Sequence, residues 1–189
     1  MLEYITQIDF SILDFIQANL RTDFLDSLMV FFSMIGEGGA VWFIVAILML
    51  FFKKSRACGI VIILSMGVTL LVGEFGLKNL FCRVRPCNVN IDIEMLVKRP
   101  SSFSFPSGHT SSSFAAATSI FIFNKKLGVP ALVLAALIGF SRLYNYVHYP
   151  SDVLAGMIFG IIVSVLVYHL VKIYHLDNKI ENLRFSRKG

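Results

Sequence analysis

Charged side chains are scarce in this chain of 189 residues. Lysine, arginine, aspartate and glutamate make up 15% of it, hydrophobic residues make up 56%, and the mean hydropathy is +0.74. Water-soluble domains carry about 25% charged residues, so the composition excludes such a domain. It predicts an integral membrane protein with one domain over residues 1–189, because each helical span takes about 20 residues plus a connection.

Cysteine is also rare, with three copies, and their spacing is not of the zinc-binding type. Cys82 and Cys87 flank a basic segment. The sequence leaves open a disulfide between them, but small residues near a helix end are the favoured interpretation. No basic residue precedes the first apolar residues, as it would in a cleavable signal, so we expect the first residues to belong to the mature protein.

Uninterrupted apolar runs are mostly shorter than the usual span of about 20 residues, but six of them follow one another. A Gly-Glu-Gly-Gly cluster at residues 36–39 separates the first two and predicts a turn. The pattern predicts an all-α membrane protein with six transmembrane helices in a bundle, although it leaves open whether the first run crosses fully. The runs are residues 24–35, 40–52, 57–80, 110–123, 127–146 and 153–173.

The residues before the first run predict an amphipathic helix at the membrane interface. Apolar residues recur there at helical spacing, and polar residues occupy the opposite face. The apolar positions are Ile5, Ile8, Ile12, Leu13 and Ile16, and the polar positions are Asp9, Asp14 and Gln17.

Basic residues outside the runs predict the orientation. Three basic groups follow the second, fourth and sixth runs, which places them on one side of a six-helix bundle. The positive-inside rule makes that side, with both termini, cytoplasmic in a plasma membrane of the bacterial type. Four cations fall on the outer side, where an anionic ligand explains them better than topology. The inner groups are Lys53, Lys54 and Arg56; Lys125 and Lys126; and Lys172, Lys179, Arg184, Arg187 and Lys188; the outer cations are Arg83, Arg85, Lys98 and Arg99.

The first of three polar clusters is KNLFCRVRP, residues 78–86. Lys78 and Arg85 are seven residues apart, so they share a helix face if the helix continues to the residue before Pro86. Both side chains could then point into one pocket at the membrane surface. The alternative is a pair that snorkels to the interface, with Glu74 neutralising Lys78 at i,i+4 spacing.

The second cluster is PSGH, residues 106–109, which precedes a run rich in small and hydroxyl residues. A proline and a glycine before a helix start leave free backbone amides, and a helix N-terminus favours an anion. His109 would lie in the first turn, beside that anion. The alternative is a turn with Ser107 as a capping residue.

The third cluster is SRLYNYVHYPSD, residues 141–152. Pro150 prevents a continuous helix, so His148 is expected in a turn and Asp152 in the first turn of the next helix. The carboxylate could accept one imidazole N–H and leave the other nitrogen free to attack, as in catalytic triads. The alternative is a histidine–aspartate cap on a helix start.

Together the clusters read K-x6-RP, PSGH and SR-x5-H-x3-D, and their order and spacing resemble the three-part signature of the type 2 phosphatidic acid phosphatase superfamily. The similarity runs over residues 78–152 without a departure at a signature position. It implies a six-helix membrane phosphatase that works through a phosphohistidine and needs no metal or other cofactor. No carboxylate cluster suited to a hard metal ion lies near the motifs.

The resemblance also implies a role for each motif residue. His148 would be the nucleophile and Asp152 its orienting partner, while His109 would protonate the leaving oxygen and later activate water. Three fixed cations suit a phosphoryl transition state whose charge is spread over three oxygens. The residues that would bind the phosphoryl group are Lys78, Arg85, Arg142, Ser107 and Gly108.

A site at the outer leaflet predicts an amphiphilic substrate, a lipid phosphate or pyrophosphate, and no nucleic acid partner. Undecaprenyl pyrophosphate ranks first, because small bacterial members of the superfamily frequently recycle that carrier. Phosphatidic acid, phosphatidylglycerophosphate and lipid A are alternatives. Two other classes remain open: a transporter or flippase, which would favour broken helices and repeated halves, and a vanadate haloperoxidase, although such enzymes are soluble. The oligomeric state is not predicted.

Overall fold

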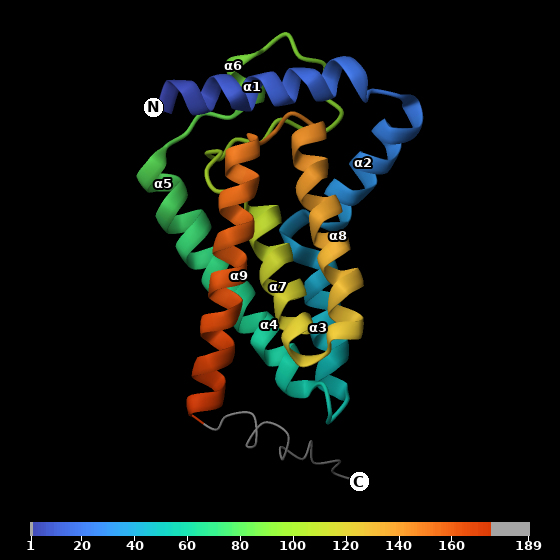
Figure 1. The fold of residues 1–189 in the computed structure, drawn as a ribbon, viewed down its shortest axis with the longest axis vertical. Coiled ribbons are helices and arrows are strands. Elements are labelled where there is room, and N and C mark those ends of the chain that lie inside the picture. Colours follow the sequence, from blue (N-terminus) through green and yellow to red (C-terminus); the bar gives the residue numbers. More distant parts are fainter. Residues whose placement is uncertain (1, 175–189) are drawn as a thin grey trace.

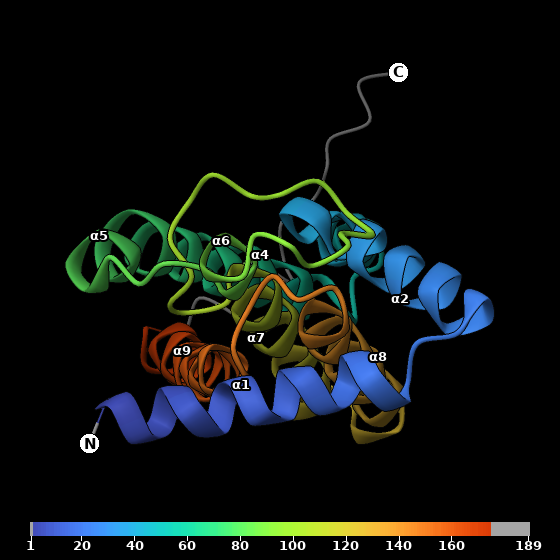
Figure 2. The ribbon, with the colours of Figure 1, turned by 90° about the horizontal axis from the view of Figure 1, so that it is seen from above.

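A computed structural model describes residues 2–174, and all their regular elements are helices. Three helices, α7 (Gly108–Phe123), α8 (Lys125–Tyr144) and α9 (Pro150–Ile173), stand in a bundle in which α7 packs against both others. The predicted N-terminal helix is present as α1 (Leu2–Asn19), which lies across one end of the bundle (Figures 1 and 2). The predicted all-α class is therefore confirmed for the described residues.

The next two helices form one bent path. α2 (Asp23–Ile35) passes through a short 3₁₀ turn, η1 (Glu37–Gly39), into α3 (Ala40–Phe51). Gly38 and Gly39 have φ values of 56° and 71°, which glycine adopts without the steric cost that a side chain would bring. The two helices are bent by 47°. The glycine cluster therefore bends the chain without reversing it.

A long helical stretch leads back toward α1. α4 (Arg56–Val68) continues into a π-helical segment, η2 (Thr69–Leu77), and a last turn, α5 (Lys78–Phe81). Cys82 ends it in the left-handed conformation, with a φ of 46°. The chain then runs without helix to the short α6 (Pro86–Val89). Pro86 disfavours the helical conformation at Arg85, the residue before it.

Within residues 2–174, three stretches are long and apolar enough to cross a membrane: Arg56–Val89, Lys125–Tyr144 and Pro150–Ile173. The bent pair of α2 and α3 raises the number to four if it forms one span. The central helix α7 has 16 residues and is about 24 Å long at 1.5 Å per residue. The six predicted spans are not confirmed, because the first two predicted runs lie on one bent path.

Small residues allow α9 to lie directly against α7. A Cβ atom at Gly156 would lie 2.7 Å from the Ser107 carbonyl oxygen, and one at Gly160 would collide with the Ser111 carbonyl. On α7, three consecutive alanines at residues 115–117 are fully buried. Close backbone contact through small residues is typical of membrane bundles. It holds the N-terminal turns of α7 and α9 side by side, and these turns carry parts of two polar clusters.

The outer surface of the bundle is apolar along its length. On α9, large apolar side chains are exposed at every third or fourth position, and a helix that faces lipid on one side has this pattern. The exposed residues are Leu154, Ile158, Ile162, Leu166, Leu170 and Ile173.

The two ends of the bundle differ in charge. The first two basic groups lie in the α3–α4 connection with the start of α4 and in the first turn of α8, at the end opposite α1 (Figure 1). Of the third group, Lys172 lies in the last turn of α9, and the other four cations lie outside the described residues. The described chain begins at the α1 end and finishes at the other. The side on which each terminus lies stays a prediction, because residues 175–189 are outside the described residues.

Candidate active site

A cavity of about 1080 Å³ lies between the bent α2–α3 pair, α4 with η2, α7 and α8, and residues 96–102 close one side of it. All three polar clusters contribute to its polar walls, while other walls are apolar. Polar and apolar walls in one cavity suit a ligand with both characters. The cations and histidines from the three clusters are Lys78, Arg85, His109, Arg142 and His148, Lys98 and Arg99 also line the cavity, and the apolar residues include Val30, Met34, Phe43, Ile63, Met66 and Leu70.

His148 and Asp152 form the centre of the third cluster. His148 lies in the turn before α9 and Asp152 in the first turn, as predicted, and both are buried. The imidazole Nδ1 lies 3.5 Å from Asp152 Oδ2. Ser104 Oγ donates to Oδ2 at 2.5 Å and lies 3.4 Å from Nδ1. Oδ2 also accepts from Tyr149 N at 2.9 Å, so the carboxylate caps α9 as well as facing the imidazole.

The second imidazole nitrogen, Nε2, faces Arg85, whose Nη1 is 3.0 Å away. A guanidinium can only donate, so Nε2 is the acceptor and the ring proton lies on Nδ1, toward Asp152. Burial lowers the pKa of His148 well below its usual 6.5, and this effect exceeds the opposing one of Asp152. His148 is therefore a neutral imidazole at pH 7, and its lone pair lies on Nε2.

Lys78 and Arg85 converge on Ser102. The helix ends at Phe81, so they do not share a helix face, and the condition set by their spacing is not met. Arg85 donates to the Ser102 carbonyl at 2.7 Å and to Ser102 Oγ at 3.0 Å, while Lys78 Nζ donates to Oγ at 3.3 Å. Lys78 also pairs with Glu74 at 2.7 Å. The predicted pairing with Glu74 and the predicted common pocket are both present.

His109 and Arg142 face the cavity from α7 and α8. His109 Nε2 lies 3.3 Å from Glu37 Oε2, which comes from the bend between α2 and α3. Arg142 Nη1 donates a short hydrogen bond to Ser33 Oγ, but the buried Nε has no hydrogen-bond partner among the described residues. Buried donors are almost always paired. Arg142 thus has a donor left for a bound molecule.

The N-terminus of α7 holds the second cluster. α7 begins at Gly108, and His109 lies in its first turn, as predicted. The Ser107 side chain does not cap the helix; instead its Oγ accepts a hydrogen bond from Thr110 Oγ1 at 2.9 Å, which leaves its own proton to donate. A Cβ at Gly108 would collide with the Glu74 carboxylate. The Glu74 carboxylate therefore lies against this helix end, and the binding of an anionic ligand there stays a prediction.

Several residues that hold the motif side chains are not marked by any sequence motif. Ser102 and Ser104 lie in the irregular segment between α6 and α7, and Glu37 lies in the bend before α3. A polar residue beside a glycine cluster, as in GEGG, was the available signal for Glu37. The two serines lie in a serine-rich loop and carry no such signal.

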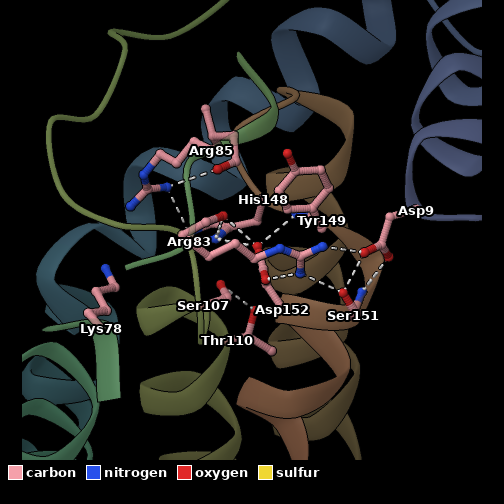
Figure 3. A network of polar contacts seen from close by, with 12 residues as sticks. Asp9, Lys78, Arg83, Arg85, Ser107, Thr110, His148, Tyr149, Ser151 and Asp152 are labelled. Carbon is pink, nitrogen blue, oxygen red and sulfur yellow. Dashed lines mark hydrogen bonds and ion pairs between the residues drawn. The ribbon is translucent and has the colours of Figure 1, made fainter. Parts of the chain in front are cut away.

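Arg83 corrects an expectation. The sequence places it among outer cations that would bind an anionic ligand, but its guanidinium donates to two carboxylates of the protein (Figure 3). Arg83 lies 2.7 Å from Asp9 of α1 and 2.6 Å from Asp152 of α9. Two acidic side chains therefore explain this cation.

Cys82 and Cys87 are free thiols, as is Cys58, so the disulfide that the sequence left open is absent. Within residues 2–174, no group of three or more histidine, cysteine, aspartate or glutamate side chains is arranged to hold a metal ion.

Comparison with known proteins agrees with this arrangement. The family model described as PAP2 superfamily matches residues 58–175. An undecaprenyl-diphosphatase of Sulfolobus acidocaldarius is 34% identical over 75% of this chain and 68% of its own length. A lipid A 4'-phosphatase of Bacteroides thetaiotaomicron is 30% identical over 85% of this chain and 75% of its own.

A solved structure is also similar. The crystal structure of a transmembrane PAP2 type phosphatidylglycerolphosphate phosphatase from Bacillus subtilis superposes with a TM-score of 0.71 at 28% identity, over 96% of this chain and 90% of that one. The family match covers more than half of the chain and includes all three polar clusters, which the fold gathers around one cavity. The chain belongs to the PAP2 superfamily.

Proposed function

We propose that this protein is a membrane lipid phosphatase that hydrolyses a phosphomonoester or pyrophosphate bond of a lipid through a phosphohistidine intermediate. One observation carries the proposal: two histidines and five cations, three of them from the polar clusters, meet in a cavity that also has apolar walls. A lipid phosphate matches both parts, because its phosphate needs cations and its tail needs apolar contacts.

In the first half of the reaction, His148 Nε2 attacks the phosphorus atom. The bond from phosphorus to the leaving oxygen, which belongs to the lipid alcohol or to the remaining lipid phosphate, breaks, and that oxygen takes a proton from His109. Asp152 accepts a hydrogen bond from His148 Nδ1–H and stabilises the positive charge that develops on the imidazole. Glu37, 3.3 Å from His109 Nε2, stabilises the protonated imidazole that a general acid requires.

In the second half, a water molecule attacks the phosphoryl group on His148. His109, now neutral, takes a proton from that water, the phosphorus–nitrogen bond breaks, and inorganic phosphate leaves. Three cations neutralise the oxygens in both steps, with further hydrogen bonds from Ser107 and the Gly108 amide. Fixed cations can stabilise a loose phosphoryl transition state as metal ions do in other enzymes, so we expect no metal requirement. The three cations are Lys78, Arg85 and Arg142.

Undecaprenyl pyrophosphate is the lead substrate. The 34% identical relative from Sulfolobus acidocaldarius is an undecaprenyl-diphosphatase, which supports this choice. Phosphatidylglycerophosphate is the second candidate, because the superposed Bacillus subtilis structure is a phosphatidylglycerolphosphate phosphatase. Lipid A follows from the Bacteroides relative, and phosphatidic acid remains in the group on chemical grounds.

The topology follows from the same arrangement. We place the bent α2–α3 pair, the stretch from α4 to α5, α7, α8 and α9 across the membrane, with α1 on its surface. The cavity then lies toward the outer face, because the basic α3–α4 and α7–α8 connections favour the cytoplasm. This count is one fewer than the six predicted spans, and it puts α1 on the outer surface.

Release of inorganic phosphate tests the function. The purified full chain in detergent should release phosphate from at least one lipid of a panel of four, fastest from undecaprenyl pyrophosphate, with EDTA present. Vanadate should inhibit, since it mimics a five-coordinate phosphoryl group. Release from none of the four, with lipid movement across vesicle membranes instead, would indicate a transporter. Loss of activity in EDTA that a divalent ion restores would indicate another enzyme class.

Activity should be lost on acidification only below about pH 6.5, the usual pKa of histidine. His148 must be neutral to attack, and its folded-state pKa is below 6.5 because burial disfavours the imidazolium. The neutral form therefore persists as the pH falls through 6.5 and is lost only at lower pH. We expect kcat/KM for lipid hydrolysis to hold at pH 6.5 and to fall below it. A decline of kcat/KM on acidification that is centred at or above pH 7 would contradict the assignment of His148 as the nucleophile.

Arg142→Lys should lower kcat/KM by roughly 100-fold, the scale of losing one transition-state donor. An ammonium cannot reproduce two parallel hydrogen bonds from a planar guanidinium. The matched control is Arg21→Lys, because Arg21 also pairs through two nitrogens, with Asp26, outside the cavity. We expect the control to keep its activity. Equal losses in both variants would remove the special role of Arg142.

Labelling with an impermeant thiol reagent checks the orientation. In a background without the three native cysteines, Ser101→Cys should react in intact cells, because Ser101 is exposed at the cavity. Lys54→Cys should stay unlabelled until the membrane is opened, because Lys54 is exposed in the basic α3–α4 connection. The reverse pattern would place the cavity in the cytoplasm and exclude a lipid carrier spent at the outer surface.

A further inference from the structure

The interfacial helix α1 has three faces. One packs on the bundle, where Leu13 and Ile16 are buried. A second carries exposed apolar side chains at helical spacing, which in a membrane protein lie against lipid. The third is polar. The exposed apolar residues are Tyr4, Ile5, Ile8, Ile12 and Phe15.

Asp9 is an acidic residue on the buried face of α1, only 2% exposed. Its Oδ1 accepts from Ser151 N at 2.9 Å, and its Oδ2 accepts from Ser151 Oγ at 2.5 Å. Oδ2 also accepts from Arg83 Nη2 at 2.7 Å. A buried carboxylate is costly unless it is paired and hydrogen-bonded, and Asp9 is both. This side chain ties α1 to the start of α9 and to the segment after α5.

Arg83 connects that carboxylate to the proposed catalytic pair (Figure 3). Its Nη1 donates to Asp152 Oδ1 at 2.6 Å and to Ser151 Oγ at 2.7 Å. The guanidinium also stacks on the Tyr149 ring, 3.9 Å from the ring centre. A planar fork held on three sides has little freedom. Arg83 is thus fixed between the two carboxylates.

The two oxygens of Asp152 have separate tasks. Oδ1 is held by Arg83, and Oδ2 faces His148 Nδ1, Ser104 Oγ and Tyr149 N. Arg83 therefore fixes the plane of the carboxylate that orients the imidazole. Its charge also stabilises the carboxylate as an anion, so that Asp152 does not depend on a protonated His148 for a counter-charge.

We propose that Arg83 and Asp9 are positioning residues for phosphoryl transfer, with Asp9 acting through Arg83, and that α1 thereby belongs to the catalytic apparatus. The inference rests on the proposed function, in which His148 attacks and Asp152 orients it. Neither residue lines the cavity, so their effect is on the reacting imidazole and not on substrate binding.

A variant in the same helix, Asp14→Asn, tests whether Asp9 only attaches α1 to the bundle. Asp14 accepts a hydrogen bond from the Tyr146 hydroxyl at 2.9 Å and so also attaches α1 to the bundle, without contact to Arg83. If loosening α1 were the cause of lost activity, Asp14→Asn would lower activity as Asp9→Asn does. If Asp9 acts through Arg83, Asp14→Asn keeps its activity.

Kinetics of four variants separate these cases. Arg83→Gln should lower kcat by roughly 10- to 100-fold, the usual scale for a group that supports a reacting residue, with KM unchanged. The kcat of Arg83→Lys should lie between those of the wild type and Arg83→Gln, because one ammonium cannot hold both carboxylates. Asp9→Asn should lose less than Arg83→Gln, and the double variant should lose no more than Arg83→Gln alone, within about 2-fold. Losses that multiply in the double variant, or an effect on KM alone, would overturn the proposal.

Histidine titration gives a readout that does not need turnover. The charged groups facing His148 are Asp152 from α9, Arg85 before α6 and Arg142 from α8, with Arg83 behind Asp152. Removing the Arg83 charge leaves the carboxylate free to stabilise an imidazolium. The His148 pKa, followed by nitrogen-15 NMR and assigned with His148→Gln, should rise by about one unit in Arg83→Gln.

An unchanged His148 titration in folded Arg83→Gln would refute the inference even if the wild type hydrolyses lipids. Conversely, a shifted titration in a protein that releases no phosphate from any lipid would refute the proposed function and leave the Arg83–Asp152 coupling in place. Thermal unfolding of each variant in detergent identifies misfolded protein, and Arg83→Lys, which keeps the charge, should then show the wild-type titration.

Discussion

His148→Ala should abolish lipid phosphate hydrolysis, with kcat lower by about 10⁴-fold or more, as for the loss of a covalent nucleophile. Nε2 of His148 is an unprotonated acceptor at the cavity, and the Asp152 carboxylate lies 3.5 Å from the other ring nitrogen. Initial rates of phosphate release at saturating lipid measure the effect.

The matched control is His169→Ala. His169 lies on the same helix as Asp152, is exposed, and stacks beside Tyr168 far from the cavity lining. We expect it to retain wild-type turnover. Hydrolysis by the His148 variant at the control rate would end the phosphohistidine mechanism.

His109→Ala should lower hydrolysis of lipid phosphomonoesters, whose leaving group is an alkoxide, by about 10²- to 10⁴-fold, the usual contribution of a general acid. The loss should depend on the leaving group, because His109 delivers a proton to the oxygen that departs. With a substrate whose leaving group needs no proton, such as an aryl phosphate of low leaving-group pKa, attack by His148 should proceed and the phosphoenzyme should accumulate.

Glu37→Gln gives the comparison for this variant, since it keeps His109 but removes the carboxylate 3.3 Å from Nε2. It should show the same dependence on leaving group in weaker form. If His109→Ala slowed phosphoenzyme formation equally for good and poor leaving groups, His109 would be assigned to phosphate binding instead of proton transfer to the leaving oxygen.

Much of the candidate site is predictable from the sequence because its chemistry is local. Pro150 separates His148 from α9 and places Asp152 in the first helical turn, and Gly108 starts α7 one residue before His109. Proline and glycine act on neighbouring residues, so these positions follow from residue type alone. The pairing of Lys78 with Glu74 is likewise local.

The parts that the sequence does not predict depend on contacts between distant segments. Arg83 meets Asp9 across 74 residues of chain, and Ser104 meets Asp152 across 48. Hydropathy does not distinguish a bend from a reversal, so the 47° angle between α2 and α3 was not accessible from the glycine cluster. The proposed number of spans and the proposed side of α1 both depend on that angle.

Mass spectrometry of the trapped phosphoenzyme tests most directly whether His148 is the nucleophile. Purified His109→Ala protein, mixed with an aryl phosphate and quenched in alkali, is digested and searched for a phosphorylated residue. Phosphohistidine survives alkali and is lost in acid. We expect one acid-labile phosphate on His148, and none in the double variant that carries both His109→Ala and His148→Ala. Phosphate on any other residue, or none in a protein that still turns the substrate over, would contradict it.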